Sequence, residues 1–209
     1  MRPEGGRFIV DNRLRSLKAV LLAPAVRITA RVSPLILTAA SFGTGLAVAV
    51  LIVSDRPAAA LTCWLISRVF DGLDGEVARY GNKQSDLGGY LDIMGDITVY
   101  AVILIALTAS VSPGPWGALA VLLATFYVNI GSWMYLAAVL EKRKAEQPAR
   151  ELYSTSIEMP GGLVEGTESV VFIAVALLFR SHLPLLFGVF SLMTAITIAQ
   201  RVRWAWNSI

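Results

Sequence analysis

DGLDGEVARYGNKQSDLGGYLDIMGD, residues 71–96, is the most acidic part of an otherwise apolar region. It holds two pairs of acidic side chains, which are Asp71 and Asp74, then Asp92 and Asp96. On helices that turn about 100° per residue, the first pair shares a face about 100° wide with Gly75 and Ala78, and the second pair continues a stripe about 80° wide from Gly88. The polar residues 81–85 supply a turn between the two helices. Antiparallel neighbouring helices would therefore bring four carboxylates to one depth.

The composition around this stretch indicates a membrane protein. Of 209 residues, 56% are hydrophobic and only 16% are charged, against roughly 25% charged in soluble domains. The mean hydropathy is +0.64, which the core of a soluble domain of this size does not require. Six spans of about 20 residues each would explain the excess. The net charge of +3 is modest, and no soluble face of mixed basic and aromatic residues indicates nucleic-acid binding.

Stretches without charge locate the spans, because a charge at mid-bilayer costs at least about 2.5 kcal/mol. The uncharged stretches are 32–54, 97–140, which the turn 112–115 divides in two, and 183–200. Two further apolar stretches, 57–80 and 160–179, carry charges and are where function is expected. We predict an all-α integral membrane protein in which residues 32–209 form one membrane domain of six transmembrane helices.

Residues 1–31 are predicted to form a cytoplasmic N-terminal segment. Leucines alternate with basic residues along 10–30, which is typical of an interfacial amphipathic helix; a basic tail that only sets the topology is the alternative. Charges interrupt the first apolar run, so we expect no cleavable signal peptide. All lysines and arginines except Arg56, Arg68 and Arg180 fall where both termini and the second and fourth loops would be cytoplasmic.

The aspartates are also the groups best suited to hold a metal. A single cysteine, Cys63, and a single histidine, His182, provide neither an intramolecular disulfide framework nor a structural zinc site. Four converging carboxylates repel one another unless cations compensate them. Ligands that are all oxygen suit Mg²⁺, or Mn²⁺ in its place. Two such ions flanking a pyrophosphate are a recurrent arrangement for phosphoryl transfer.

The four aspartates resemble the signature of the CDP-alcohol phosphotransferase family, at whose spacings Gly75, Ala78, Arg79 and Gly88 also stand. The resemblance implies a homodimeric six-helix enzyme of the cell membrane, with its active site on the cytoplasmic side. Such enzymes cleave a CDP-linked donor, usually CDP-diacylglycerol, and pass the phosphoryl-bearing group to an alcohol with release of CMP. Phospholipid synthesis is the expected context.

The resemblance also assigns roles to single residues. The four aspartates are expected to bind two Mg²⁺ ions, and Asp96 is also expected to act as the general base. A pocket for the CDP donor is implied for residues with small or polar side chains, which are Gly72, Gly75, Ala78, Arg79, Ser85 and Thr38. The family often has Pro-Asn-x-x-Thr before the first span, whereas this chain has Leu35 in place of the asparagine, so only Thr38 is carried over.

The choice of acceptor is expected to depend on charged residues outside this stretch. Glu165 and Glu168 lie three residues apart and would repel a phosphate. We therefore expect a neutral or cationic acceptor: a polyol, inositol or an amino alcohol. The further candidates are Lys142, Arg143, Arg150 and Arg201. Two alternatives remain open: the glutamates bond to neighbouring helices or help hold metal, and residues 142–144 anchor the loop to anionic headgroups.

Other functions also remain open at this stage. The donor could be CDP linked to a small alcohol, or the acceptor could be anionic, such as inositol phosphate or glycerol phosphate. A divalent-cation binding or transport protein is the alternative that is not an enzyme. The aspartates could also form salt bridges with Arg68 and Arg79, and Arg68 itself either supports the acids or touches substrate.

Overall fold

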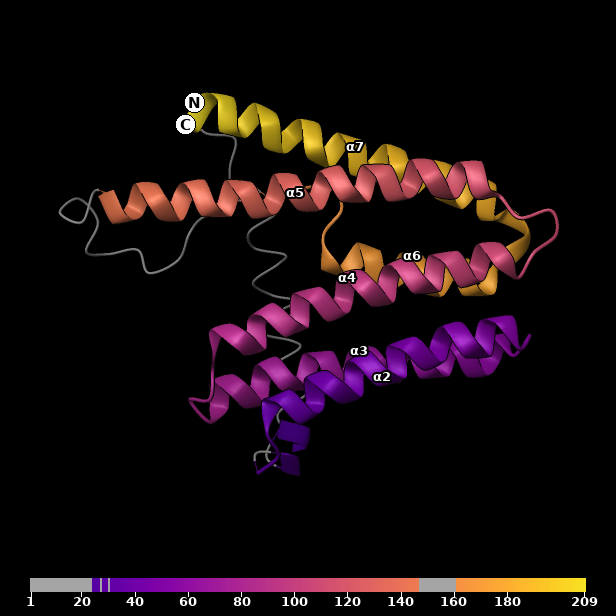
Figure 1. The fold of residues 1–209 in the computed structure, drawn as a ribbon, viewed down its shortest axis with the longest axis horizontal. Coiled ribbons are helices and arrows are strands. Elements are labelled where there is room, and N and C mark those ends of the chain that lie inside the picture. The colour runs from indigo at the N-terminus through magenta and orange to yellow at the C-terminus, as the bar shows by residue number, and fades with distance from the viewer. Residues whose placement is uncertain (1–23, 27, 30, 147–160) are drawn as a thin grey trace. The chain divides into compact units, whose positions relative to one another are not determined.

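The structure, a computed structural model, describes residues 24–26, 28, 29, 31–146 and 161–209. Every regular element in these ranges is helical, as the sequence predicted. The elements in chain order are α2 (Pro34–Val53), α3 (Pro57–Tyr80), α4 (Asp86–Ala109), α5 (Trp116–Glu146), α6 (Gly166–Leu178), the 3-10 helix η1 (Arg180–His182) and α7 (Leu183–Ser208) (Figure 1). The chain divides after Gly114 into two compact units.

Proline or a capping side chain marks the start of most helices. A proline occupies the first turn of α2, α3 and α7, where its missing N–H breaks no helical hydrogen bond. Ser85 caps α4, because its hydroxyl accepts the backbone N–H of Gly88 at 3.1 Å. The turn before it contains Asn82 at φ 50°, in the left-handed region that asparagine tolerates better than most residues. The predicted turn at 81–85 is confirmed.

In the first unit, α2 packs closely against both α3 and α4. Ser41 and Ser67 exchange hydrogen bonds across the α2–α3 contact, each hydroxyl donating to the other's carbonyl at 3.1 and 2.9 Å. One turn further along α2, Gly45 faces Val99 of α4, and a Cβ there would lie 2.7 Å from both valine methyl carbons. Small residues on α2 therefore set how closely the two other helices approach it.

The second unit is built on the packing of α5 against α7. Phe172 of α6 stacks on Phe190 of α7 at a ring centroid distance of 3.9 Å. The turn before α6 is fixed to α7 by side chains, because Gln200 accepts the N–H of Leu163 and Thr197 accepts the N–H of Val164. Gly162 is needed beside Thr197, since any Cβ at that position would overlap the threonine side chain.

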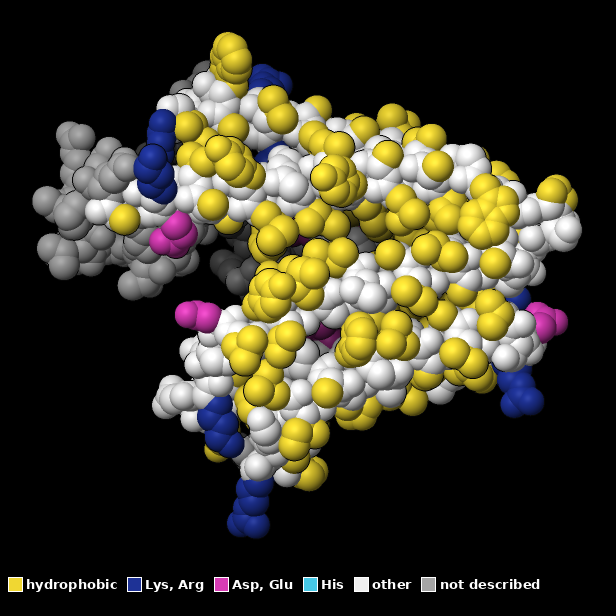
Figure 2. Space-filling model, viewed as in Figure 1, with side chains coloured by type: hydrophobic (Ala, Val, Ile, Leu, Met, Phe, Trp, Pro, Cys, Tyr) yellow, Lys and Arg dark blue, Asp and Glu magenta, His cyan; other side chains and the backbone are white. Residues whose placement is uncertain are grey.

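Among the described residues, four helices are long and apolar enough to cross a membrane: α2, α4, α5 and the segment from η1 through α7. Helix α3 has the predicted bounds, 57–80, and enough length, but it carries several charges. On the visible face, hydrophobic side chains dominate and charged ones are few (Figure 2). The chain is therefore a multi-pass membrane protein, while the number of six spans stays a prediction.

The predicted span 160–179 needs correction in its bounds. The helix itself runs from Gly166 to Leu178, only 13 residues. Residues 161–165 form the turn docked on α7, and Glu165 and Glu168 lie at the helix N-terminus and in its first turn. The reason is a capping box, in which the Glu165 side chain accepts the backbone N–H of Glu168 and the Glu168 side chain accepts the N–H of Glu165. Glu165 also accepts the N–H of Gly162. Hydropathy alone did not separate this turn from the helix.

Most of the predicted amphipathic helix at 10–30 lies outside the described residues. Its described end, which belongs to the first unit, packs on α2 and α3. Val26 is buried in an apolar cluster with Leu37, Leu73 and Val77. This contact places the chain just before α2 against the start of α2 and the end of α3.

We predict that Gly45→Ala destabilises the protein, whereas Gly43→Ala does not. The Val99 side chain is β-branched and stiff, so α4 must move to admit the new methyl group. Such overpacking typically costs about 1–3 kcal/mol. A Cβ at Gly43 would meet nothing within 4 Å. Thermal unfolding in detergent measures both, and equal midpoints for the two variants would contradict this account of α2 packing.

Candidate active site

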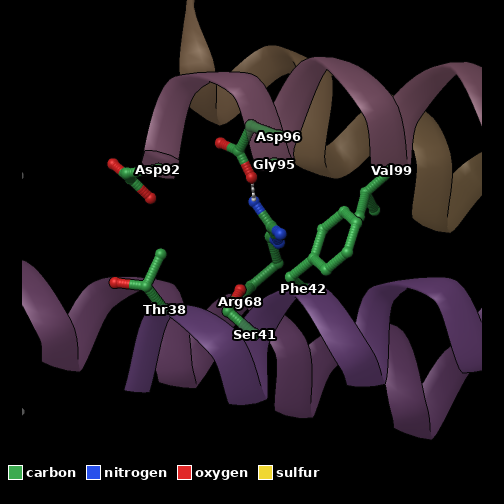
Figure 3. Close-up of a pocket in the computed structure, with 8 residues that line it drawn as sticks. All are labelled: Thr38, Ser41, Phe42, Arg68, Asp92, Gly95, Asp96 and Val99. Carbon is green, nitrogen blue, oxygen red and sulfur yellow. Dashed lines mark hydrogen bonds and ion pairs between the residues drawn. The ribbon is translucent and has the colours of Figure 1, made fainter. Parts of the chain in front are cut away.

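The spacing of the aspartates along the sequence places them beside one another on α3 and α4, next to α2. A small, partly open pocket lies between these helices. Figure 3 shows Asp92 and Asp96 directed into it from α4, Thr38 and Ser41 from α2, and Arg68 from α3. Asp74 and Asp71, on the next turns of α3, are respectively buried and partly buried. The structure thus brings all four predicted aspartates and Thr38 into one unit.

Thr38 holds the carboxylate of Asp74. Its hydroxyl lies 2.7 Å from Asp74 Oδ2 and donates to it. Asp74 is only 6% exposed, so a hydrogen bond to its charged form is important for keeping it there. Thr38 therefore orients the Asp74 carboxylate, a role separate from the nucleotide contact that was predicted for it.

Arg68 is the cation nearest the aspartates. Its Nη1 lies 2.8 Å from Asp96 Oδ1 and 3.6 Å from Asp71 Oδ1, so the guanidinium bridges α3 and α4. Trp64, one turn back on α3, lies under the guanidinium at 4.5 Å from its ring centroid. Of the alternatives for Arg68, the structure therefore shows a partner of the acids.

The charge balance of this cluster remains strongly negative. Asp92 is repelled by the other three aspartates and attracted by Arg68, so one guanidinium faces four carboxylates. Within the described ranges, no three acidic, histidine or cysteine side chains are arranged as a metal site. The donor chemistry nevertheless fits a hard divalent cation, because every candidate ligand is a carboxylate oxygen and the negative charge exceeds what Arg68 compensates.

The residues predicted to bind the donor are near the end of α3 and the start of α4. Arg79 lies over Gly75, where a Cβ would be 3.3 Å from its guanidinium, and it pairs with Glu76 at 2.8 Å. Gly72 is buried and Ala78 partly buried on the same helix. Ser85 is exposed and caps α4. The structure thus gives Ser85 a structural hydrogen bond and leaves its predicted contact to the nucleotide as a proposal.

The candidates for acceptor binding lie in the second unit or outside the described residues. Arg201 is 7% exposed, and its Nη1 donates to the backbone and side-chain oxygens of Asn129 at 3.1 and 2.8 Å. Glu165 attracts the Arg201 charge. Arg143 donates to the main-chain oxygen of Ile209 at 2.6 Å. Lys142 is exposed, and Arg150 lies outside the described residues.

The model of the CDP-alcohol phosphatidyltransferase family matches residues 31–199, which is most of the chain. The chain belongs to this family. It is therefore a phosphotransferase of phospholipid synthesis, and the matched range contains all four aspartates together with their supporting residues.

Two relatives accompany the family match. An Escherichia coli (strain K12) protein, inner membrane protein YnjF, is 29% identical over 201 residues, which cover 93% of this chain and 94% of the relative. The crystal structure of Mycobacterium tuberculosis phosphatidylinositol phosphate synthase with CDP-DAG bound is 20% identical, with a TM-score of 0.66. It matches 88% of this chain and 92% of its own. That likeness shows a shared fold.

Sequence reasoning about this family member missed two aromatic residues of the site. Trp64 precedes Arg68 by four residues, and Tyr100 follows Asp96 by four, so each extends the charged face of its helix by one turn. Their rings meet edge to face at 5.4 Å. The same helical spacing that related the aspartates would have found both, had it been followed into the apolar part of each helix.

We predict that Thr38→Val lowers stability while Thr38→Ser retains it. Valine has the shape of threonine but cannot donate to Asp74, and losing a hydrogen bond to a charged group costs about 1.5–3 kcal/mol. Serine keeps the hydroxyl. Thermal unfolding in the presence of a chelator isolates this effect from metal binding. A valine variant as stable as the wild type would show that Thr38 does not hold Asp74.

Proposed function

We propose that the protein transfers the phosphatidyl group of CDP-diacylglycerol to the hydroxyl of a small alcohol and releases CMP. The observation that carries this proposal is that Asp92 and Asp96 of α4 line one pocket of α2, α3 and α4, within the range that the family model matches. The bound CDP-DAG in the structural relative supports this choice of donor. In the alternative reaction, the donor is CDP linked to a small alcohol and a different molecule is the acceptor. The same residues would carry out this reaction.

Asp96 is proposed to accept the proton of the attacking hydroxyl. Arg68 holds one carboxylate oxygen of Asp96, and the other points away from the guanidinium (Figure 3). The acceptor oxygen would form a new bond to the phosphorus of the phosphatidyl group, while the bond from that phosphorus to the CMP oxygen breaks. The proton moves to Asp96, and CMP leaves with the electron pair of the broken bond.

The four aspartates are proposed to hold two Mg²⁺ ions, with Mn²⁺ as a possible substitute. These ions would neutralise the charge on the diphosphate when bound. The residues around them have tasks of their own. Thr38 orients the carboxylate of Asp74. Arg79, exposed at the end of α3, would exchange its pairing with Glu76 for a donor phosphate.

The floor of the donor pocket is proposed to be formed by small residues. The small side chains of Gly72, Gly75 and Ala78 would let a flat nucleotide base approach the backbone of α3 once Arg79 moves off Gly75. Ser85 would close the pocket from the start of α4 with its hydroxyl. Such close approach to a helix backbone is the usual reason for small side chains next to a nucleotide.

The acceptor is proposed to be neutral or cationic. Glu165 and Glu168 are exposed within the second unit, and their carboxylates carry negative charge at the turn before α6. Both already accept a backbone N–H, so their positions are fixed. A hydroxyl-rich or amino alcohol suits such groups better than a phosphate.

One observation favours an anionic acceptor as the second candidate. The buried Arg201 has no hydrogen-bond partner at Nε, and a phosphate is a good acceptor for an arginine. Lys142, Arg143 and Arg150 would then contribute further positive charge. The attraction between Glu165 and Arg201 reduces the charge available for this, which is why the neutral or cationic acceptor is preferred.

The proposed setting is a homodimer in the cell membrane, with both termini and the active site on the cytoplasmic side. The distribution of lysine and arginine supports this orientation. The Escherichia coli relative is named an inner membrane protein, which supports the location.

An acceptor screen tests the proposed function. Purified protein with CDP-diacylglycerol and Mg²⁺ is expected to release CMP with inositol, glycerol or ethanolamine, and to stop when a chelator is added. CMP release only with inositol phosphate or glycerol phosphate would replace the preferred acceptor with the anionic one. CMP release only from a CDP-linked small alcohol would replace the donor. Cation flux through liposomes with no CMP from any donor would contradict the enzyme function.

We predict that Asp96→Asn lowers turnover by at least about a hundredfold, because asparagine cannot take the proton of the acceptor. Binding of CDP-diacylglycerol, measured separately, should survive. The matched control is Asp86→Asn, which removes an exposed carboxylate in the first turn of the same helix. Turnover of the Asp96 variant close to that of the control would exclude Asp96 as the base.

A further inference from the structure

The guanidinium of Arg68 is an unusual group to find in the middle of α3. Its side chain is only 10% exposed, and a buried charge is costly unless it is compensated. Asp96 accepts its hydrogen bond at 2.8 Å, and Asp71 lies 3.6 Å away. Arg68 thus contacts the predicted general base and a second predicted metal ligand at once.

The position of Arg68 is also fixed by groups other than the aspartates. Its Nη2 donates to Ser67 Oγ at 3.2 Å, and the same hydroxyl is tied to the backbone of Ser41 on α2. The guanidinium carbon lies 4.5 Å from the Trp64 ring centroid and 5.7 Å from that of Tyr100. Attraction between a cation and aromatic faces strengthens where water is excluded. These groups together form a binding position for one positive charge, which we call the Arg68 seat.

This seat lies where the negative charge is highest. Arg68 attracts Asp92 as well as its two closer partners, so its charge acts on three of the four aspartates. A divalent cation entering the cluster would meet both the carboxylates and the guanidinium. Arg68 and the cation therefore act on the same carboxylates with charges of the same sign, and each weakens the binding of the other.

We propose that Arg68 is the resident counter-charge of the aspartate cluster: it positions the Asp96 carboxylate and lowers the affinity of the cluster for divalent cations. This inference rests on the proposed metal-dependent transfer. Arg68 is a positioning residue, because it acts through Asp96 and Asp71. Its presence keeps the cluster compensated before metal and donor arrive, and limits how tightly the metal is held afterwards.

A salt bridge with a purely structural task would behave differently when it is removed. Its loss would loosen α3 and α4, and metal affinity and turnover would fall together. Loss of a counter-charge instead raises metal affinity while turnover falls, because Asp96 is no longer held in place. These opposite directions distinguish the two roles.

The experiment measures Mn²⁺ binding to the purified full chain in lipid nanodiscs, without nucleotide, by electron paramagnetic resonance of the free ion. Arg68→Met, which keeps an unbranched side chain of apolar character, is expected to bind Mn²⁺ at least about tenfold more tightly. Its turnover in the CMP assay is expected to fall about tenfold or more, since small displacements of reacting groups have effects of this size. The inference is overturned if the Mn²⁺ affinity of Arg68→Met is unchanged or weaker.

Two further variants complete the design. Arg68→Lys retains the charge, so its Mn²⁺ affinity should stay close to that of the wild type, and it serves if Arg68→Met fails to fold. A lysine variant that binds Mn²⁺ as tightly as expected for the methionine variant would overturn the inference. Arg56→Met removes an exposed charge at the opposite end of α3 and should change neither quantity.

The same preparations separate this inference from the proposed function. Wild-type protein that binds Mn²⁺ and releases CMP upholds the function, even where the Arg68 variants overturn the counter-charge. Wild-type protein that neither binds Mn²⁺ nor releases CMP overturns both.

Discussion

Compensation of charge between apolar helices is the constraint on which the first unit depends. Four carboxylates with one guanidinium among them can remain between helices only where each group has a partner of opposite charge or a hydrogen bond. Arg68 provides the first for Asp96 and Asp71, and Thr38 provides the second for Asp74. The close packing of α2 makes this possible, because its small residues bring Thr38 and the Arg68 seat within reach of the aspartates.

The helix boundaries of this unit followed closely from local chemistry. Uncharged stretches and the turns at 81–85 and 112–115 located the helices, and the structure shows prolines or Ser85 at their starts. Around α6 the same approach was wrong, because an apolar run of ordinary length hides a turn whose amides are satisfied by side chains distant in sequence. Gln200 and Thr197 of α7 accept two of these amide hydrogen bonds. The sequence near residue 163 does not indicate that these distant side chains are the partners.

The site was predictable where helical spacing determined it. The placement of the four aspartates on the neighbouring helices α3 and α4 of one unit followed from their positions in the sequence. The contacts of Arg68 did not, because they require knowing how far α3 and α4 stand apart and which rings fill the space between them. The capping role of Glu165 and Glu168 was similarly hidden. An acidic residue in an apolar stretch usually indicates a side chain that binds a ligand. Here both carboxylates instead accept hydrogen bonds from backbone N–H groups.

The short length of α6 has a consequence for the bilayer itself. Thirteen residues extend about 20 Å, against about 30 Å for a hydrocarbon core. If α6 crosses the membrane, the irregular turn before it lies at the depth of the acyl chains, where unpaired amides are not tolerated. Its amides at residues 162–165 are all paired with side chains. A bilayer that matched this short helix would be thinner around it, and a water-soluble molecule would then cross less hydrocarbon to reach the protein interior.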